Sequence, residues 1–171
     1  MLKSTLVTFC VLLSLTVIAQ GTLPKGASQL NGGFGFSSFG VPVYIGADFG
    51  IHETITIGPR VSYRKNTEKY FGNNYNQSLT VISFNGNYQF NKLLNLPDPW
   101  NLYTGLTIGY YLWSDVSLNG SRSGFSGEGS GLGVDAQIGG RYFFTKRLAV
   151  NLEIGGGTGS GGNIGITYKL Q

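Results

Sequence analysis

The sequence predicts an all-β fold, a transmembrane antiparallel up-and-down β-barrel of eight strands preceded by a cleaved signal peptide. The prediction rests on an apolar N-terminal stretch, on repeated alternation of apolar and polar residues, and on a composition of 28 glycines with only 12 Lys and Arg and 8 Asp and Glu in 171 residues. Average soluble domains contain about 7% Gly and about 25% charged residues. The 41% hydrophobic content excludes a disordered chain, and 5 prolines without a Gly-X-Y period exclude collagen.

The N-terminus has the pattern of a secretory signal peptide. Lys3 precedes an apolar stretch over residues 6–19, which is shorter than the roughly 20 residues that a spanning helix needs. Val17 and Ala19 occupy the −3 and −1 positions and predict cleavage before Gln20. We therefore expect three parts: a signal peptide at 1–19, a short N-terminal lead at 20–29 and a barrel at 30–171.

Eight segments alternate apolar and polar residues with the period of two that indicates strands with two different faces. They span residues 30–38, 43–51, 55–64, 79–90, 102–112, 132–144, 148–155 and 164–170. In the clearest segments the apolar side is formed in turn by Val43, Ile45, Ala47, Phe49 and Ile51; by Ile55, Ile57, Val61 and Tyr63; by Leu132, Val134, Ala136, Ile138, Tyr142 and Phe144; by Leu148, Val150, Leu152 and Ile154; and by Ile164, Ile166, Tyr168 and Leu170. Pro59 lies in the middle of the third segment and predicts a local bulge or twist, because it cannot donate to the ladder.

The distribution of charge decides which face meets lipid. No position of the apolar face carries a charge, and the charged strand residues all lie on the other face: Asp48, Arg60, Arg64, Asp135, Arg141, Glu153 and Lys169. If those charges faced water, the aromatic and aliphatic side chains would have to fill the interior of an eight-stranded barrel, which is too narrow for them. An apolar exterior facing lipid removes this difficulty, and closure of the sheet pairs the backbone groups that hydrocarbon cannot solvate.

Strand glycines concentrate on the same polar face. In the second to eighth segments, Gly86 and Gly140 point to lipid, whereas nine glycines point to the lumen: Gly46, Gly50, Gly58, Gly105, Gly109, Gly133, Gly139, Gly155 and Gly165. Glycine relieves crowding on the concave side of a narrow, strongly curved sheet. We therefore expect these glycines to make room for larger lumenal side chains.

The connections predict the orientation in the membrane. The candidate inner turns are 52–54, 91–101 and 145–147, and the candidate outer loops are 39–42, 65–78, 113–131 and 156–163. Outer-membrane barrels have short periplasmic turns and longer extracellular loops, and the two longest connections fall outside. An aromatic girdle is expected at both membrane interfaces, formed by Phe49, Tyr88, Phe90, Tyr142, Phe144 and Tyr168 on the inner side and by Tyr63 and Tyr110 on the outer side.

These strand patterns carry a family resemblance. The runs VYIGADFGI, ITIGPRVSYR, ISFNGNYQFN, LYTGLTIGYY, VDAQIGGRYFF and NLEIGGGTG followed by NIGITYKL resemble the small porin-like outer-membrane β-barrel domain proteins, which are related in architecture to the OmpA- and OmpX-type eight-stranded barrels. The resemblance covers about residues 28–171. It implies the fold and a location in the outer membrane of a Gram-negative cell, and it implies no activity, because the motifs are strand patterns.

The lumenal charges predict a structural network rather than a pore. An eight-stranded barrel has an interior that side chains can fill, and buried charges are costly unless they are paired. Threading the segments through the barrel places Arg64 with Asp135 and Glu153 toward the outer end. It places Asp48 with Arg141 and Lys169 toward the inner end.

No feature of the sequence predicts catalysis, a cofactor or a metal site. The only histidine, His52, falls in a short periplasmic turn away from the loop serines, which argues against the lipid A deacylase or acyltransferase activity of some small outer-membrane barrels. The only cysteine, Cys10, lies in the signal peptide. Gly157, Gly159 and Gly162 match G-x-G-x-x-G, but a strand rather than a helix follows them. Lys and Arg are scattered, which argues against a nucleic-acid partner.

The sequence therefore predicts a non-enzymatic outer-membrane barrel, plugged by side chains, whose surface loops serve structural, interaction or adhesion roles. The expected partners are outer-membrane lipid and lipopolysaccharide, with loops 65–78 and 113–131 as candidate protein-binding elements. Two alternatives stay open, a subunit of a larger outer-membrane assembly and a small-solute channel.

Overall fold

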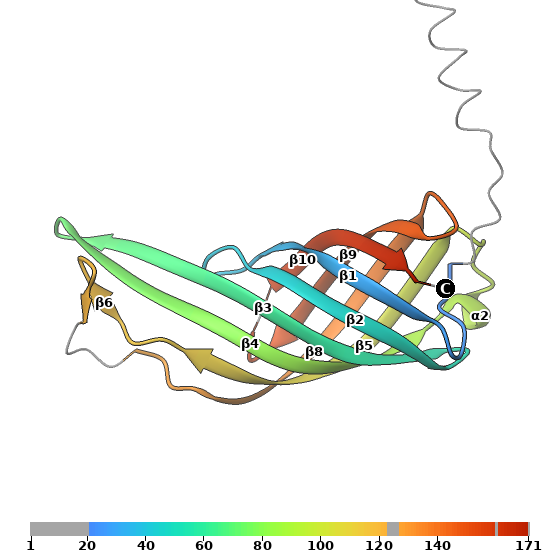
Figure 1. The fold of residues 1–171 in the computed structure, drawn as a ribbon, viewed down its shortest axis with the longest axis horizontal. Helices are drawn as coiled ribbons and strands as arrows, with labels where there is room; N and C mark the ends of the chain where they lie inside the picture. The colour runs from blue at the N-terminus through green and yellow to red at the C-terminus, as the bar shows by residue number, and fades with distance from the viewer. Residues whose placement is uncertain (1–20, 123–126, 160, 171) are drawn as a thin grey trace, which may run out of the picture.

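The computed structural model describes residues 21–122, 127–159 and 161–170, so the predicted signal peptide at 1–19, with Cys10, lies outside the described residues. The chain forms one ten-stranded antiparallel sheet (Figure 1). Two strands have only two residues each, and the other eight form a ring in the order β3-β2-β1-β10-β9-β8-β5-β4, which the β3–β4 pairing closes. The predicted eight-stranded antiparallel barrel is therefore confirmed.

Each of the eight predicted segments forms a strand. The ring consists of β1 (Ser28–Phe36), β2 (Val43–His52), β3 (Ile55–Tyr70), β4 (Asn73–Gln89), β5 (Trp100–Trp113), β8 (Gly131–Phe143), β9 (Leu148–Gly157) and β10 (Gly161–Lys169). The remaining elements are the short helix α2 (Asn91–Leu94) and the two-residue strands β6 (Ser117–Leu118) and β7 (Ser121–Arg122).

The alternation produces an apolar exterior and a polar interior. The outward residues of the ring are exposed, among them Ile45 at 65% and Ile108 at 60%, whereas inward residues such as Asn85 are buried. This distribution is the reverse of that in a soluble barrel, and it is the pattern of a barrel whose outer face meets lipid. None of the helices in the described part of the chain is long and apolar enough to cross a membrane.

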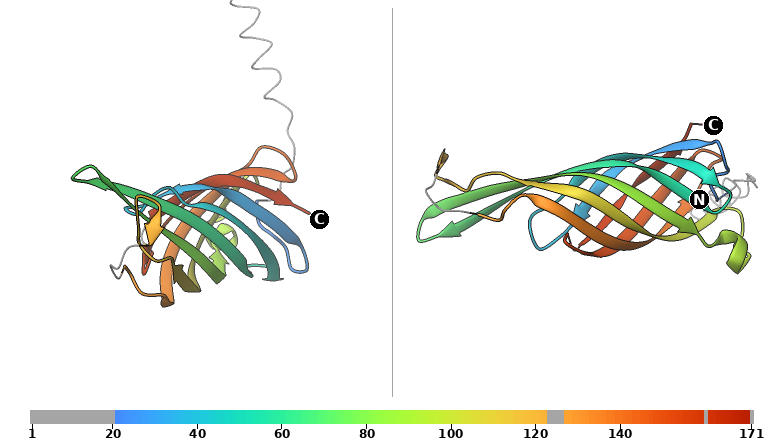
Figure 2. Two further views of the ribbon diagram at one scale, coloured as in Figure 1. Left: turned by 60° about the vertical axis from the view of Figure 1, so that its left-hand side comes forward. Right: turned by 90° about the horizontal axis from the view of Figure 1, so that it is seen from below.

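The outer loop expected at 65–78 is instead a continuation of two strands. The β3–β4 ladder runs without a break to the pair Tyr70 and Asn73, and the turn consists of Phe71 and Gly72, both with positive φ. The hairpin projects far beyond the rest of the barrel (Figure 2). Beyond the membrane both faces of a strand meet water, so the apolar alternation disappears while the backbone pairing continues.

We expect a bulge or a local twist at Pro59, and the structure shows no bulge there. The β2–β3 ladder lacks a pair opposite Pro59, but its register is the same on both sides of this gap. The irregularity lies further along the ladder, between Gly50 and His52. Gly58 allows the strands to stay close, because a Cβ there would lie 1.7 Å from the carbonyl oxygen of Ala47.

The N-terminal lead turns into the inner mouth of the barrel, at the same end as the C-terminal residues (Figure 2). Leu23 in this lead is only 1% exposed. The lead joins the barrel through two backbone hydrogen bonds. The amide of Gly26 donates to the carbonyl oxygen of Gly50 at 2.8 Å, and the amide of Gly50 donates to the carbonyl oxygen of Ala27 at 2.9 Å. The lead therefore packs against the inner end of the barrel.

Candidate functional site: the polar lumen and its mouths

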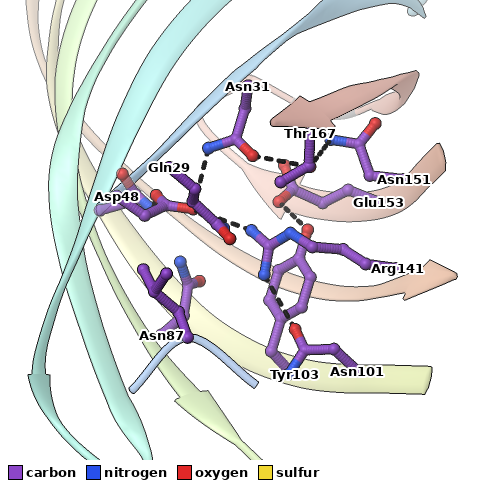
Figure 3. A network of polar contacts seen from close by, with 12 residues as sticks. Gln29, Asn31, Asp48, Asn87, Asn101, Tyr103, Arg141, Asn151, Glu153 and Thr167 are labelled. Carbon is purple, nitrogen blue, oxygen red and sulfur yellow. Dashed lines mark hydrogen bonds and ion pairs between the residues drawn. The ribbon is translucent and has the colours of Figure 1, made fainter. Parts of the chain in front are cut away.

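A buried ion pair lies at the centre of the lumen (Figure 3). The Nη2 atom of Arg141 on β8 lies 2.9 Å from Oδ2 of Asp48 on β2, and both side chains are 2% exposed. Asp48 also accepts hydrogen bonds from the amide groups of Gln29 and Asn31, at 2.9 Å each, and from that of Asn85, at 3.2 Å. Four donors thus surround this carboxylate and compensate its burial.

Arg141 connects this centre to the next layer of the lumen. Its Nη1 donates to Oδ1 of Asn101 at 3.0 Å, and its guanidinium lies 4.1 Å from the centroid of the Tyr103 ring. The Tyr103 hydroxyl donates to Oε2 of Glu153 at 2.9 Å. The same ring packs against Gly139, where a Cβ would lie 2.4 Å from the nearest tyrosine atoms. The lumenal glycine therefore creates the space that the ring occupies.

A second ion pair joins Arg60 and Glu153. Nη1 of Arg60 lies 2.5 Å from Oε1 of Glu153, and Nη2 lies 3.2 Å from Oε2, so the pair is bidentate. The predicted pairing of Glu153 with Arg64 is wrong. The strands of a barrel tilt and are staggered, so residue order along separate strands does not give their level along the barrel axis.

Arg64 and Asp135 lie together at the outer end of the lumen, where the threading places them. They line a cavity of about 100 Å³ and interact electrostatically. The two oxygens of Asp135 accept hydrogen bonds from the Tyr111 hydroxyl and, at 2.7 Å, from the amide of Gly159.

Lys169 lies at the inner mouth, but not in the predicted pairing with Asp48. Its Nζ donates to the carbonyl oxygen of Thr22 at 2.8 Å and lies 4.0 Å from the centroid of the Phe143 ring. Gln89 holds the same lead from another side, because its Oε1 accepts the Leu23 amide at 3.0 Å and its Nε2 donates to the Leu23 carbonyl oxygen at 3.3 Å.

Uncharged polar side chains form much of the lumen, whereas the predicted network contains only charged residues. The buried amides of the strands are Gln29, Asn31, Asn85, Asn87, Gln89, Asn101, Gln137 and Asn151. The sequence does carry a signal for them, because in the strands they occupy the same alternating positions as the charges. The lumen is thus a mixed amide, tyrosine and ion-pair network.

The residues predicted for the aromatic girdle lie on the outside of the barrel. Seven of the eight are exposed, and Phe90 is half-buried. Tyr88 and Phe90 contact edge to face with ring centroids 5.3 Å apart. Trp100 joins this set through an edge-to-face contact with Tyr142, at 4.9 Å. It is missing from the predicted girdle because its position falls within the expected turn 91–101.

The inner turns carry further titratable groups. His52 is exposed at the end of β2, and its Nδ1 lies 3.0 Å from Oγ1 of Thr54. Glu53 pairs with Lys92 of α2 at 3.0 Å, and this ammonium group lowers the pKa of the Glu53 carboxyl. Within the described ranges, no three His, Cys, Asp or Glu side chains gather to hold a metal ion.

The closed ring of eight strands and its apolar exterior define the class: the chain is an eight-stranded transmembrane β-barrel of the outer-membrane type. No protein-family model matches the sequence, and no curated protein matches it. Solved structures match the fold. The chain is similar to the outer membrane protein OprG from Pseudomonas aeruginosa, with a TM-score of 0.65 and 12% identity over 91% of this chain and 99% of that one.

Two further structures show the same architecture. The N-terminal β-barrel domain of Pseudomonas aeruginosa OprF matches with a TM-score of 0.62 and 12% identity over 85% of this chain and 98% of that one. Ail, the attachment invasion locus protein of Yersinia pestis, matches with a TM-score of 0.56 and 10% identity over 85% and 99%. At these identities the likeness shows the fold. That fold and the apolar exterior are those of an integral protein of the outer membrane.

Proposed function

We propose that this protein is a non-enzymatic outer-membrane barrel whose lumen is closed by side chains and whose outer surface carries its function. The two ion pairs that cross the lumen are the observation that supports its closure by side chains. Asp48 with Arg141 and Arg60 with Glu153 each join opposite walls, and the Tyr103 ring lies between them. This arrangement leaves no row of unpaired charges that would line a conducting pore.

The outer surface supports an interaction role. The β3–β4 hairpin extends past the end of β2, and β6 pairs with its β4 edge. A groove of about 480 Å³ opens there, lined by Phe39, Asn66, Glu68, Phe71, Tyr75, Asn76, Gln77 and Val116. Aromatic rings beside amide groups give large contact area with adaptable hydrogen bonding, a composition that suits binding surfaces. Lipid and lipopolysaccharide are the partners that the apolar exterior suits, and the projecting hairpin suits a protein partner or an external surface.

Planar-bilayer recording tests the closed lumen. The refolded wild-type protein should give no large, stable conductance steps. Tyr103→Ala removes the ring that fills the centre and should raise the conductance. Tyr110→Ala deletes a tyrosine that faces lipid and should leave it unchanged. Large, stable steps from the wild-type protein would show that it is a small-solute channel and contradict the plug.

Co-purification in mild detergent tests whether the barrel stands alone. A free-standing barrel should elute at the size of one chain with its bound detergent. Stable association with other outer-membrane proteins would instead make it a subunit of a larger assembly. Shortening the β3–β4 hairpin to a tight turn after Arg64 should abolish any such association while the barrel still shows its heat-dependent gel mobility.

A further inference from the structure

The cavity at the outer end of the lumen lies beneath the β1–β2 and β9–β10 connections. The Arg60–Glu153 ion pair lines it on the lumenal side, and Ser62, Arg64 and Asp135 line its wall. A volume of about 100 Å³ has room for several water molecules or for one small polyatomic ion. The cavity thus lies between these connections and the Arg60–Glu153 ion pair.

The negative groups of this pocket already have partners. Both oxygens of Glu153 accept hydrogen bonds from Arg60, and the Tyr103 hydroxyl and the Asn163 amide group add two more. Each oxygen of Asp135 also accepts one hydrogen bond. A cation entering the pocket would therefore compete with existing donors for every carboxylate oxygen.

Two hydrogen-bond donors of the pocket, both on β3, have no such partners in the described part of the chain. The guanidinium of the half-buried Arg64 makes neither a hydrogen bond nor an ion pair with any residue that the structure describes. Its Nη2 lies beside Gly159, where a Cβ would be 3.3 Å away. The hydroxyl of Ser62, two residues earlier on the same face, likewise has no hydrogen bond within the described ranges. A guanidinium fork and a hydroxyl that line the same pocket offer the kind of donors that a phosphate-type oxyanion accepts.

We propose that Arg64 and Ser62 form a binding site for a phosphate-type oxyanion at the outer mouth of the lumen. The anion would take the guanidinium and hydroxyl donors that the fold leaves unused. Asp135 lies on the same pocket, so its charge repels the anion and limits the affinity. The phosphate group has two possible sources, a lipopolysaccharide headgroup and a small solute from outside the cell.

The test uses the full mature barrel, refolded into phosphatidylcholine nanodiscs and titrated with inorganic phosphate. We expect saturable NMR shifts at the Arg64 Nε–H and at the Gly159 amide. Arg64→Gln should weaken binding at least about tenfold, since it removes charge-assisted hydrogen bonds. Lys65→Gln makes the same charge change on an exposed neighbour outside the pocket and should leave binding unchanged. Asp135→Asn should strengthen binding, because it removes the repelling charge.

A second set of nanodiscs contains lipopolysaccharide and no free phosphate. Shifts at the same two groups in these discs alone identify the headgroup as the source, whereas shifts with inorganic phosphate alone identify a solute. Heat-dependent gel mobility verifies that each variant is folded. Arg64→Lys keeps the charge but lacks the guanidinium fork, so it should bind phosphate with intermediate affinity. This variant replaces Arg64→Gln in the titration if the glutamine variant fails to fold. The proposal is overturned if neither probe gives saturable shifts, if Arg64→Gln and Lys65→Gln weaken binding equally, or if Asp135→Asn weakens it.

Discussion

Removing the charge of Asp48 should destabilise the barrel more than removing its partner Arg141. After Asp48→Asn, the buried guanidinium loses its carboxylate partner and keeps its contacts with Asn101 and the ring of Tyr103. After Arg141→Met, the carboxylate still accepts three amide hydrogen bonds. Because breaking a buried pair costs about 3–5 kcal/mol, we expect Asp48→Asn near the upper end of that range and Arg141→Met near the lower end.

The double variant measures the interaction itself. The bond between Nη2 of Arg141 and Oδ2 of Asp48 is charge-assisted at 2.9 Å, and such bonds contribute about 1.5–3 kcal/mol. The double variant should therefore lose less stability than the two single variants together, by about that amount. Equilibrium urea unfolding in phospholipid vesicles, followed by tryptophan fluorescence, gives all four free energies of unfolding.

An exposed pair provides the matched control. Glu53 and Lys92 are joined at a similar distance, 3.0 Å, but their side chains are 67% and 76% exposed. Solvent screens such pairs, so the same cycle there should show no resolvable coupling. If the stability losses of Asp48→Asn and Arg141→Met simply add in the double variant, the interaction between Asp48 and Arg141 does not stabilise the barrel, and the reasoning is refuted.

Three further outcomes follow from the contacts. Gly139→Ala should lower the free energy of unfolding by about 1–3 kcal/mol through overpacking, because the added Cβ would lie 2.4 Å from Tyr103. Gly86→Ala is the matched control: the nearest atom to its added Cβ lies at 3.9 Å, so this variant should unfold like the wild type. Gln89→Ala should speed hydrogen exchange at the lead amide that its side chain binds while the strands keep their protection. Lys92→Met should raise the pKa of Glu53, measured as its NMR titration midpoint, because it removes the ammonium group that lowers this pKa. In the wild-type protein the Glu53–Lys92 pair is intact above the usual pKa of a glutamate and is lost as pH falls through the lowered pKa of Glu53.

The sequence predicts the barrel because its lipid-facing positions admit no charge. Period-two alternation is strong wherever one face meets hydrocarbon, and all eight predicted segments are strands. The signal fails where the chain leaves the membrane. The extension of β3 to Tyr70 and of β4 back to Asn73 carries polar residues on both faces, so alternation does not reveal it although the backbone pairing continues.

The lumenal face could be predicted, and so could the groupings of Asp48 with Arg141 and of Arg64 with Asp135. The partners of Glu153 and Lys169 could not. Alternation places Arg60, Arg64 and Glu153 on the inner side without giving their height in the barrel. That height depends on strand tilt and stagger, which are properties of the closed ring. The pairing of Glu153 with Arg60 and the contact of Lys169 with the N-terminal lead both depend on that geometry.

The two ion pairs stabilise closure itself. Around the ring β3-β2-β1-β10-β9-β8-β5-β4, Asp48 on β2 and Arg141 on β8 lie four strands apart, as do Arg60 on β3 and Glu153 on β9. In a ring of eight these are opposite walls. Ladder hydrogen bonds join only neighbouring strands and are compatible with an open sheet, whereas these contacts form only when the sheet has closed. An apolar plug would exclude water equally well, but it would not favour one register of opposite walls over another. The polar lumen is therefore the part of the sequence that selects this particular closed barrel.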